Sequence, residues 1–280
     1  MPTTINTNMA SLSAQRALQS TEGSLSTSMQ RLSTGLRINS AKDDAAGLAI
    51  AERMTSQVRG MTVATRNAND AISMAQTAEG SLGKVGESLQ RMRELAVQSA
   101  NATNDTSDRA NLNDEYKALA TEVSRVLEGT KFNGKNLLNS AATDMAFQIG
   151  ADTNATDRIT VELRDMTTGD GMKAALDTAS TGSISTVEAS LDTISALDAA
   201  IDEVTSARSN LGSVQNRFES VVANLATSQE NITAARGRIT DADFAVESAN
   251  LSRAQVLSQA GNTMLAQANQ QPQQVLSLLR

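Results

Sequence analysis

The stretch MTSQVRGMTVATRNANDAISMAQTAEGSLGKVGESL, residues 54–89, decides the fold of this chain. Its apolar side chains recur mostly in steps of three, four and seven residues, the spacing that places them along one face of an α-helix. They are Met54, Val58, Met61, Ala68, Ile72, Ala75, Leu82 and Leu89. No proline stands between Pro2 and Pro272 to break a helix. The seam continues to about Asn101 and predicts a helix roughly 85 Å long.

A second seam of similar length begins after Ser185 with Val187 and Leu191 and ends near Ile232. We therefore expect the two seams to pack antiparallel. Between them the pattern predicts a shorter helix that ends near Gly129, after a turn in the polar stretch that follows the first seam. Alternating residues at 145–149 and 158–163 then predict two short strands, the one β signal that we identify. The fold class expected is mainly α: a long antiparallel helical bundle or coiled coil with a small β-hairpin.

Both ends of the chain carry apolar stripes at helical spacing. The N-terminal stripe consists of Ile5, Met9, Leu12, Leu25, Met29 and Leu32, and the C-terminal one of Leu257, Met264, Val275 and Leu278. Three spacings typical of capping boxes predict helix starts: Ser40 with Asp43, Ser185 with Glu188, and Thr240 with Asp243. Because neither terminal stripe has a companion core, we expect both to pack against other subunits.

Composition narrows the functions that the chain can have. It has 280 residues, no cysteine, histidine or tryptophan, and a formal net charge of −7. The missing residues remove the usual general base and the commonest transition-metal ligands, which argues against an enzyme and against any cofactor. The acidic balance argues against nucleic acid, and no apolar run approaches the roughly 18 residues of a membrane span. With only 2% aromatic residues, the cores must be thin seams between helices.

The stretch from Arg164 to Gly182 is rich in Gly, Thr, Asp and Ser, and we expect a surface loop with too few large side chains to bury. Asp165 and Asp170 could suggest calcium, but the alternating oxygen ligands and closing Glu of a calcium loop are missing. The hydroxyl residues around 178–185 are candidates for O-linked glycans.

Several motifs together resemble bacterial flagellin, the subunit of the flagellar filament. They are TNMASLSAQRAL from Thr7, STGLRINSAKDDAAGLAIAERM from Ser33, LQRMRELAVQSAN from Leu89, KFNGKNLL from Lys131, LGSVQNRFES from Leu211, RITDADFAVESANL from Arg238, and the closing QPQQVLSLLR. Their order covers nearly the whole chain.

The resemblance implies a filament-core domain, residues 1–42 and 240–280, in which the N- and C-terminal helices pair as a coiled coil and which folds only on assembly. It also implies a helical rod domain with a β-hairpin, residues 43–163 and 183–239. Most flagellins add an outer variable domain, and here only the short surface loop 164–182 stands in its place. The chain would be a short flagellin.

The resemblance also implies partners. The protein would be exported unfolded by the flagellar type III apparatus, bind an export chaperone through its C-terminal helix, and polymerise with copies of itself outside the cell. It would meet the filament cap and the hook-filament junction proteins. Arg91, Leu95 and Glu115 match positions through which flagellins engage the flagellin-sensing Toll-like receptor of vertebrates.

Other classes of function stay open at this point. A secreted adhesin or immune ligand would share the helical pattern without forming a filament. A hook-filament junction protein would have similar ends but would not form long fibres. An enzyme is the least favoured class, given the missing side chains.

Overall fold

The computed structural model describes residues 7–177 and 183–277, and its contacts divide the chain into two compact units. One unit comprises Met1–Gln57 and Glu230–Arg280, and the other Val58–Gln229. We call them the terminal unit and the central unit. The predicted domain boundaries, between residues 42 and 43 and between 239 and 240, stay predictions about the assembled protein.

The chain is mainly helical, as predicted. Its helices are α1 (Met9–Thr34), α2 (Ala45–Ser99), α3 (Thr106–Gly129), α4 (Asp170–Leu176), α5 (Val187–Thr240) and α6 (Phe244–Ser277), with a short 3₁₀ helix at Ala155–Asp157. Its strands are β1 (Lys131–Phe132), β2 (Lys135–Asn136), β3 (Met145–Gln148) and β4 (Arg158–Val161).

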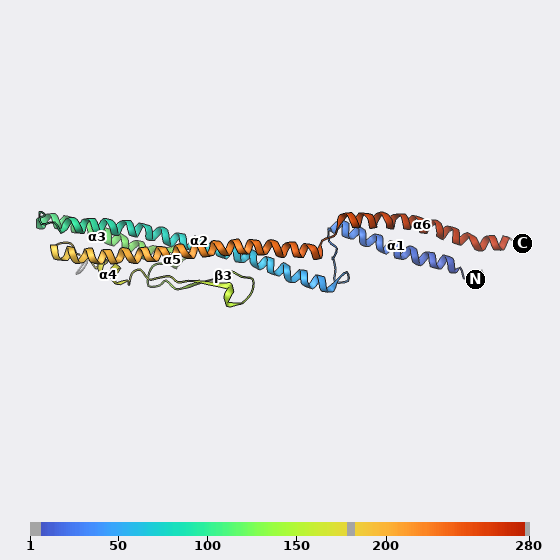
Figure 1. The fold of residues 1–280 in the computed structure, drawn as a ribbon, viewed down its shortest axis with the longest axis horizontal. Helices are drawn as coiled ribbons and strands as arrows, with labels where there is room; N and C mark the ends of the chain where they lie inside the picture. The colour runs from blue at the N-terminus through green and yellow to red at the C-terminus, as the bar shows by residue number, and fades with distance from the viewer. Residues whose placement is uncertain (1–6, 178–182, 278–280) are drawn as a thin grey trace. The chain divides into compact units, whose positions relative to one another are not determined.

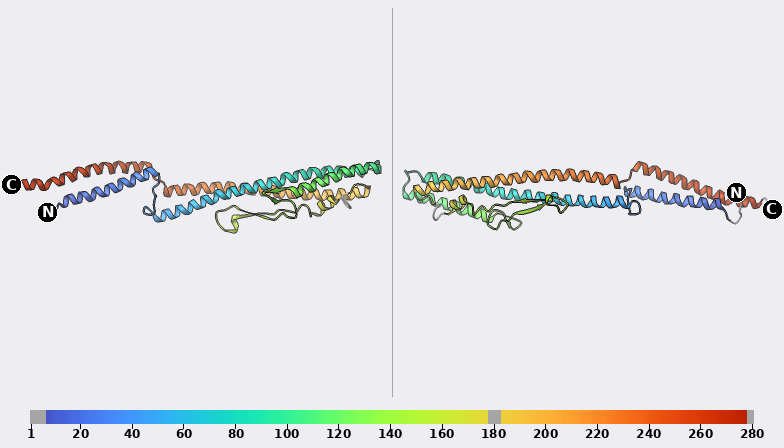
Figure 2. Two further views of the ribbon diagram at one scale, coloured as in Figure 1. Left: turned by 180° about the vertical axis from the view of Figure 1, so that it is seen from behind. Right: turned by 60° about the horizontal axis from the view of Figure 1, so that its bottom comes forward.

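In the central unit α2 and α5 run side by side in opposite directions, with α3 alongside them (Figures 1 and 2). Gln229 Nε2 lies 3.4 Å from Thr62 Oγ1 near one end of this bundle. Toward the other end Arg93 Nε donates to Asp198 Oδ1 at 2.6 Å. These contacts fix one antiparallel register, which confirms the predicted pairing of the two long seams.

The central unit has a hydrophobic core of its own, drawn from all three long helices. Its largest fully buried side chains include Met74, Leu82, Leu89, Met92, Tyr116, Leu127 and Phe218. Burying a large apolar side chain contributes roughly 1.5–3 kcal/mol. A few such residues, interleaved with buried alanines, therefore hold a thin seam together.

The first turns of α5 differ from the sequence prediction. Val187 and Leu191 are exposed, whereas Ser190 is buried. The Ser190 hydroxyl donates to Thr186 O at 2.7 Å, so the buried polar group is satisfied within the helix. Apolar spacing alone therefore assigned the wrong face to the start of this seam.

The turn between α2 and α3 falls where the polar stretch predicts it. Arg109, buried near the start of α3, donates to the carbonyl oxygens of Ser99 and Asn101. The Ser99 carbonyl has no partner inside α2 because it lies at the C-terminal end of this helix, and Asn101 lies just beyond that end. The guanidinium thus closes the end of one helix from the beginning of the next.

The predicted hairpin is present, but it is not the only β structure in the described residues. β3 and β4 pair antiparallel, with Phe147 opposite Ile159. β1 and β2 form a second hairpin, which the sequence analysis missed. Its turn is Asn133 (φ 47°) and Gly134 (φ 78°), and an Asn-Gly pair is the usual signal for such a tight turn.

The β3–β4 hairpin docks on the helices of the central unit through one aromatic contact and one polar one. The rings of Phe147 and Phe218 meet edge to face, with centroids 5.7 Å apart. Asn67 Nδ2 donates to Gln148 O at 3.0 Å. The hairpin is therefore part of the core packing of α2 and α5.

The expectation of a surface loop after Arg164 is wrong over the residues that the structure describes there. α4 forms within this stretch, and Met166, Met172 and Ala175 are buried. The hydroxyl of Tyr116 donates to Ala175 O at 2.7 Å, and burial raises the pKa of this phenol. Two methionines suffice to dock the segment because its backbone approaches α5 closely.

The residues of the predicted capping box at Ser40 form a turn that precedes α2 and do not cap the helix. Asp43 Oδ2 accepts from the backbone N–H groups of Asn39 and Ser40. The residue that caps α2 is Asp44, whose Oδ1 accepts from Gly47 N at 2.8 Å.

The other two helix starts are close to the predicted ones, with different capping residues. Thr186, not Ser185, accepts from Ala189 N at the start of α5. At the start of α6 the side chain of Asp243 accepts from Ala245 N at 2.9 Å. In the part of the chain that the structure describes, no helix is long and apolar enough to cross a membrane.

We predict opposite effects for alanine at two glycines of the central unit. A Cβ at Gly171 would lie 2.7 Å from backbone atoms of Ala199 and Ala200, so Gly171→Ala should lower the free energy of unfolding by about 1–3 kcal/mol. A Cβ at Gly83 would meet nothing within 4 Å, and Gly83→Ala should raise it by about 0.5–1 kcal/mol. Urea unfolding followed by circular dichroism measures both, and equal stability of the two variants would refute the close docking of α4 on α5.

Candidate assembly interface

The two terminal helices pair with each other in the terminal unit. α1 and α6 lie side by side and antiparallel (Figure 1). Asn8 Nδ2 donates to Ala268 O at 2.8 Å, and far along the pair the hydroxyl of Ser28 donates to Glu247 Oε1, also at 2.8 Å. The predicted pairing of the N- and C-terminal helices is confirmed.

Local sequence fixes both ends of α1. Asn8 caps its start by accepting from Ser11 N, and Gly35, in the left-handed region at φ 71°, ends it. The chain then makes one β-bridge between Leu36 and Asp241, and Arg37 N donates to Thr240 O at 2.7 Å. The bridge holds the end of α1 beside the start of α6.

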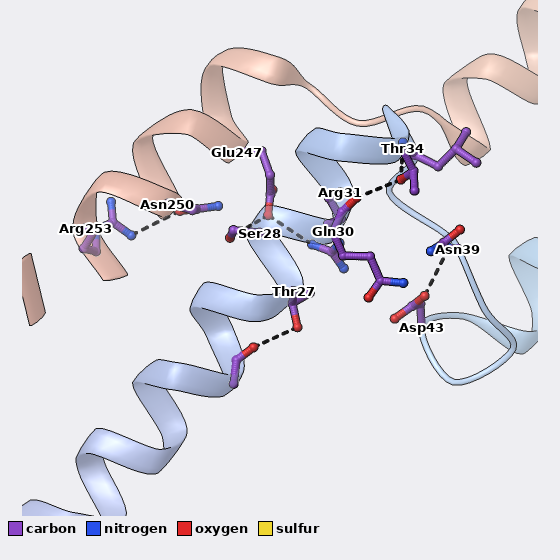
Figure 3. A network of polar contacts seen from close by, with 12 residues as sticks. Thr27, Ser28, Gln30, Arg31, Thr34, Asn39, Asp43, Glu247, Asn250 and Arg253 are labelled. Carbon is purple, nitrogen blue, oxygen red and sulfur yellow. Dashed lines mark hydrogen bonds and ion pairs between the residues drawn. The ribbon is translucent and has the colours of Figure 1, made fainter. Parts of the chain in front are cut away.

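A buried carboxylate lies at the centre of this end of the helix pair (Figure 3). Glu247 is only 7% exposed, and its Oε1 accepts from Ser28 and lies 3.8 Å from Arg31 Nη1. A buried charge is tolerated only with partners of this kind. Small side chains offer little resistance to the sliding of one helix along another. These polar contacts therefore help to set the register of α1 on α6.

The α1/α6 pair does not fill its own interface. A groove of about 670 Å³ runs between the two helices beside the Glu247 contacts. Its α1 wall consists of small residues, including Ser20, Gly23 and Ser24, while Ala254 and Leu257 contribute from α6. The pair alone therefore leaves this groove open, with both polar and apolar atoms in its walls.

The predicted assembly residues divide according to this geometry. Met9, Leu12, Met29, Leu257 and Met264 are exposed, and Leu25 and Leu32 are half-buried. Ile5 and Leu278 lie outside the described residues, and Val275 lies in α6, where only the helix is described. Five large apolar side chains on one helix pair thus face outward.

Three further exposed apolar side chains near the start of α6 were missed: Phe244, Val246 and Val256. Phe244 and Val256 lie off the stripe of Leu257 and Met264, whereas Val246 lies on it, a whole number of helical turns before them. The signal that could have found them is their chemistry, since they are large apolar residues in a segment otherwise dominated by Ser, Asn, Gln and Ala. They enlarge the unpartnered apolar surface of the terminal unit.

The three residues of the predicted receptor site lie in the central unit and do not share one surface. Arg91 Nη1 donates to Glu94 Oε2 and Nη2 to Glu115 Oε1, each at 2.9 Å, and these bonds raise the pKa of the Arg91 guanidinium. Leu95 is fully buried in the core between the helices. The structure thus brings Arg91 and Glu115 together on the exterior and directs Leu95 inward.

The described residues offer no candidate metal centre. Among them, no three Asp or Glu side chains converge as a ligand set. Asp165 uses its carboxylate on its own turn, where Oδ1 accepts from the backbone and the hydroxyl of Thr167. This contact stabilises the chain before α4.

Comparison with protein families gives two matches that together cover most of the chain. The model of the bacterial flagellin N-terminal helical region matches residues 5–143, and that of the bacterial flagellin C-terminal helical region matches residues 194–279. The matched regions include both apolar stripes, the pair of Arg91 and Glu115, and the strands β1 and β2.

Individual relatives agree with the family models. The chain is 44% identical over 277 residues to a flagellin of Halalkalibacterium halodurans, with 99% of each chain covered. It is 43% identical over 304 aligned positions to a flagellin of Bacillus subtilis, again with 99% of each covered. Among solved structures, Bacillus cereus flagellin matches with 30% identity and a TM-score of 0.50, covering 61% of this chain and 94% of that one.

We predict that the Glu247 contacts govern the local stability of the helix pair. Glu247→Ala leaves the Ser28 hydroxyl and Arg31 without their acceptor, at a cost of about 1–3 kcal/mol. Amides in residues 21–34 should then exchange with deuterium about tenfold faster or more, measured by mass spectrometry under conditions where the parent pair is formed.

Arg253→Ala is the matched control for that measurement. Arg253 is exposed, and its contact is a long one, 3.5 Å, to Asn250 on its own helix. Exchange in residues 21–34 should stay at the parental rate in this variant. Equal protection in both variants would show that the buried carboxylate does not hold the pair.

Proposed function

The chain belongs to the bacterial flagellin family, and from this premise we propose that it builds a flagellar filament by packing the terminal helices of one copy against those of others. The family makes it a structural subunit of the extracellular filament that serves swimming motility. Its 280 residues and its match along nearly the full length of the H. halodurans flagellin make it a short form of that family.

The observation that carries the proposal is the open apolar surface of α1 and α6. Monomeric proteins rarely leave several large apolar side chains and an open groove on one helix pair. The occupant that fits is a second copy of the same pair, because small residues such as Ser20 and Gly23 leave space into which an exposed Leu or Met can insert. Many copies related by one operation then form a helical polymer.

The composition of α1 and α6 supports coupled folding and assembly. Ordering a residue costs roughly 1–2 kcal/mol, and helices rich in Ala, Ser, Gln and Asn bury little apolar area to offset that cost. Neighbouring copies would supply the missing area. The helices α1 and α6 would therefore belong to the filament-core domain, residues 1–42 and 240–280, and would gain their order at the growing end of the filament.

Export and delivery follow from the same surface. An unassembled chain carries an amphipathic C-terminal helix that would aggregate with its own kind, so a chaperone that covers α6 in a groove would prevent early growth. We propose that the type III apparatus exports the chain unfolded and that it is added beneath the filament cap. The hook-filament junction proteins would contact the first copies.

A second role, recognition by the flagellin-sensing Toll-like receptor, concerns the central unit. The exposed ion pair of Arg91 with Glu115 presents a charged surface across α2 and α3. Leu95 would support this surface from the core, since its side chain does not reach solvent. We propose that monomers are recognised and filaments are not, because assembly would cover this face.

We predict that Leu257→Asp abolishes assembly. An Asp at this exposed apolar position would have to lose its hydration in the contact between copies, so filament growth should fall at least about tenfold. Electron microscopy of purified monomer on short filament seeds, with circular dichroism before and after, measures growth and the gain of helix. Gln255→Asp adds the same charge at an exposed polar position of α6 and should grow nearly as the parent does.

The same measurement separates the competing functions. A parent chain that forms no long filaments and gains no helix would be an adhesin, a soluble ligand or a junction protein. Parental growth of Leu257→Asp would instead leave the filament proposal intact and show that Leu257 does not lie in the contact between copies.

We predict that Arg91→Ala raises the monomer concentration needed for half-maximal receptor signalling about tenfold. This is the effect of losing roughly 1.4 kcal/mol at an interface hot spot. A receptor reporter cell line titrated with monomer gives the half-maximal concentration. Arg125→Ala is the control, because Arg125 is an exposed arginine that likewise pairs with a glutamate on its own helix, Glu122. Equal signalling by the two variants would remove Arg91 from the receptor surface.

A further inference from the structure

The side chains that peroxide can oxidise readily are few in this chain. It has no cysteine, tryptophan or histidine, and its single tyrosine, Tyr116, is buried. The remaining candidates are the 11 methionines. A thioether that water can reach is oxidised to a sulfoxide, whereas a buried one is protected.

The methionines divide sharply by location among the described residues. Met9, Met29 and Met264 are 64%, 57% and 60% exposed, and all three lie on α1 or α6. The methionines that are at most 1% exposed, Met74, Met92, Met166 and Met172, all lie in the core of the central unit. Met54, Met61 and Met145 are half-buried.

We propose that Met9, Met29 and Met264 are oxidation sites through which peroxide reversibly blocks assembly of the unassembled chain. The proposal rests on the proposed function, because it requires that contacts between copies cover these three side chains. The central unit would keep its fold, since its own sulfurs are shielded in the core.

The reaction is a two-electron oxygen transfer. The thioether sulfur attacks one oxygen of hydrogen peroxide, the O–O bond breaks, and the products are the sulfoxide and one water. Reversal by methionine sulfoxide reductases with a dithiol forms a disulfide and a second water. Two reductases are needed because the new sulfur centre has two epimers.

The consequence follows from the surface on which the sulfurs lie. A sulfoxide is polar and a strong hydrogen-bond acceptor, so placing it against apolar side chains removes its water without replacing those bonds. On the free chain the same group stays hydrated. Oxidation therefore penalises assembly while leaving the free chain unaffected, and methionines already covered inside a filament would be protected.

The test compares monomer before and after brief hydrogen peroxide treatment, quenched with free methionine. Peptide mass spectrometry should show Met9, Met29 and Met264 oxidised about tenfold faster or more than Met74, Met92 and Met172, in line with their exposure. Seeded growth of the oxidised monomer should fall at least about tenfold, and both reductases with dithiothreitol should restore it. Filaments given the same peroxide should show the three sulfurs protected.

Two matched variants decide where the effect lies. M9L/M29L/M264L keeps size and polarity and should grow equally with and without peroxide. M54L/M61L/M145L removes as many methionines from half-buried positions and should stay sensitive. If M9L/M29L/M264L grows poorly even without peroxide, the recovery of growth by oxidised parent after reductase treatment decides the question instead.

Three results would overturn the proposal: uniform oxidation of all methionines, normal growth of parent oxidised at the three sites, or loss of growth in M9L/M29L/M264L equal to that of the parent. Failure of the proposed function looks different. Untreated parent would then not grow on seeds, although mass spectrometry would still show the three exposed sulfurs oxidised first.

Discussion

The contact between Glu247, Ser28 and Arg31 is the point on which the terminal unit depends. Elsewhere α1 and α6 meet through contacts between uncharged groups, such as those of Asn8 with Ala268, Ser11 with Asn269 and Leu18 beside Gly261. A carboxylate that is 7% exposed cannot give up its partners without a large desolvation cost, so it fixes one register. That register decides which apolar side chains face outward and where the open groove lies.

The central unit is stabilised by different means. Its core contains Met, Leu, Tyr and Phe side chains from three helices, α4 and the β3–β4 hairpin, so it buries its own apolar surface. The terminal unit has few large side chains, and those on α1 and α6 are mostly exposed. The central unit therefore encloses its own core, whereas the terminal unit leaves most of its large apolar side chains in contact with solvent.

Much of the fold could be predicted because helical periodicity is a local property. The long seams, the turn before α3, the end of that helix at Gly129 and the β3–β4 strands are all confirmed. The β1–β2 hairpin was missed although Asn133-Gly134 is a strong local signal. The stretch that forms α4 was misread because its composition gives no hint that Gly171 approaches the backbone of α5.

The sequence by itself determined the fold class, the long helices and the family, and it identified the apolar stripes at both ends. Spacing along a helix states which residues share a face, but it does not state which face meets another element. Only the tertiary structure decided that Leu95 points into the core while Arg91 and Glu115 meet outside, and that Val187 and Leu191 are exposed. The same holds for Glu247, which reads as an ordinary surface residue in sequence and becomes buried because α1 brings Ser28 against it.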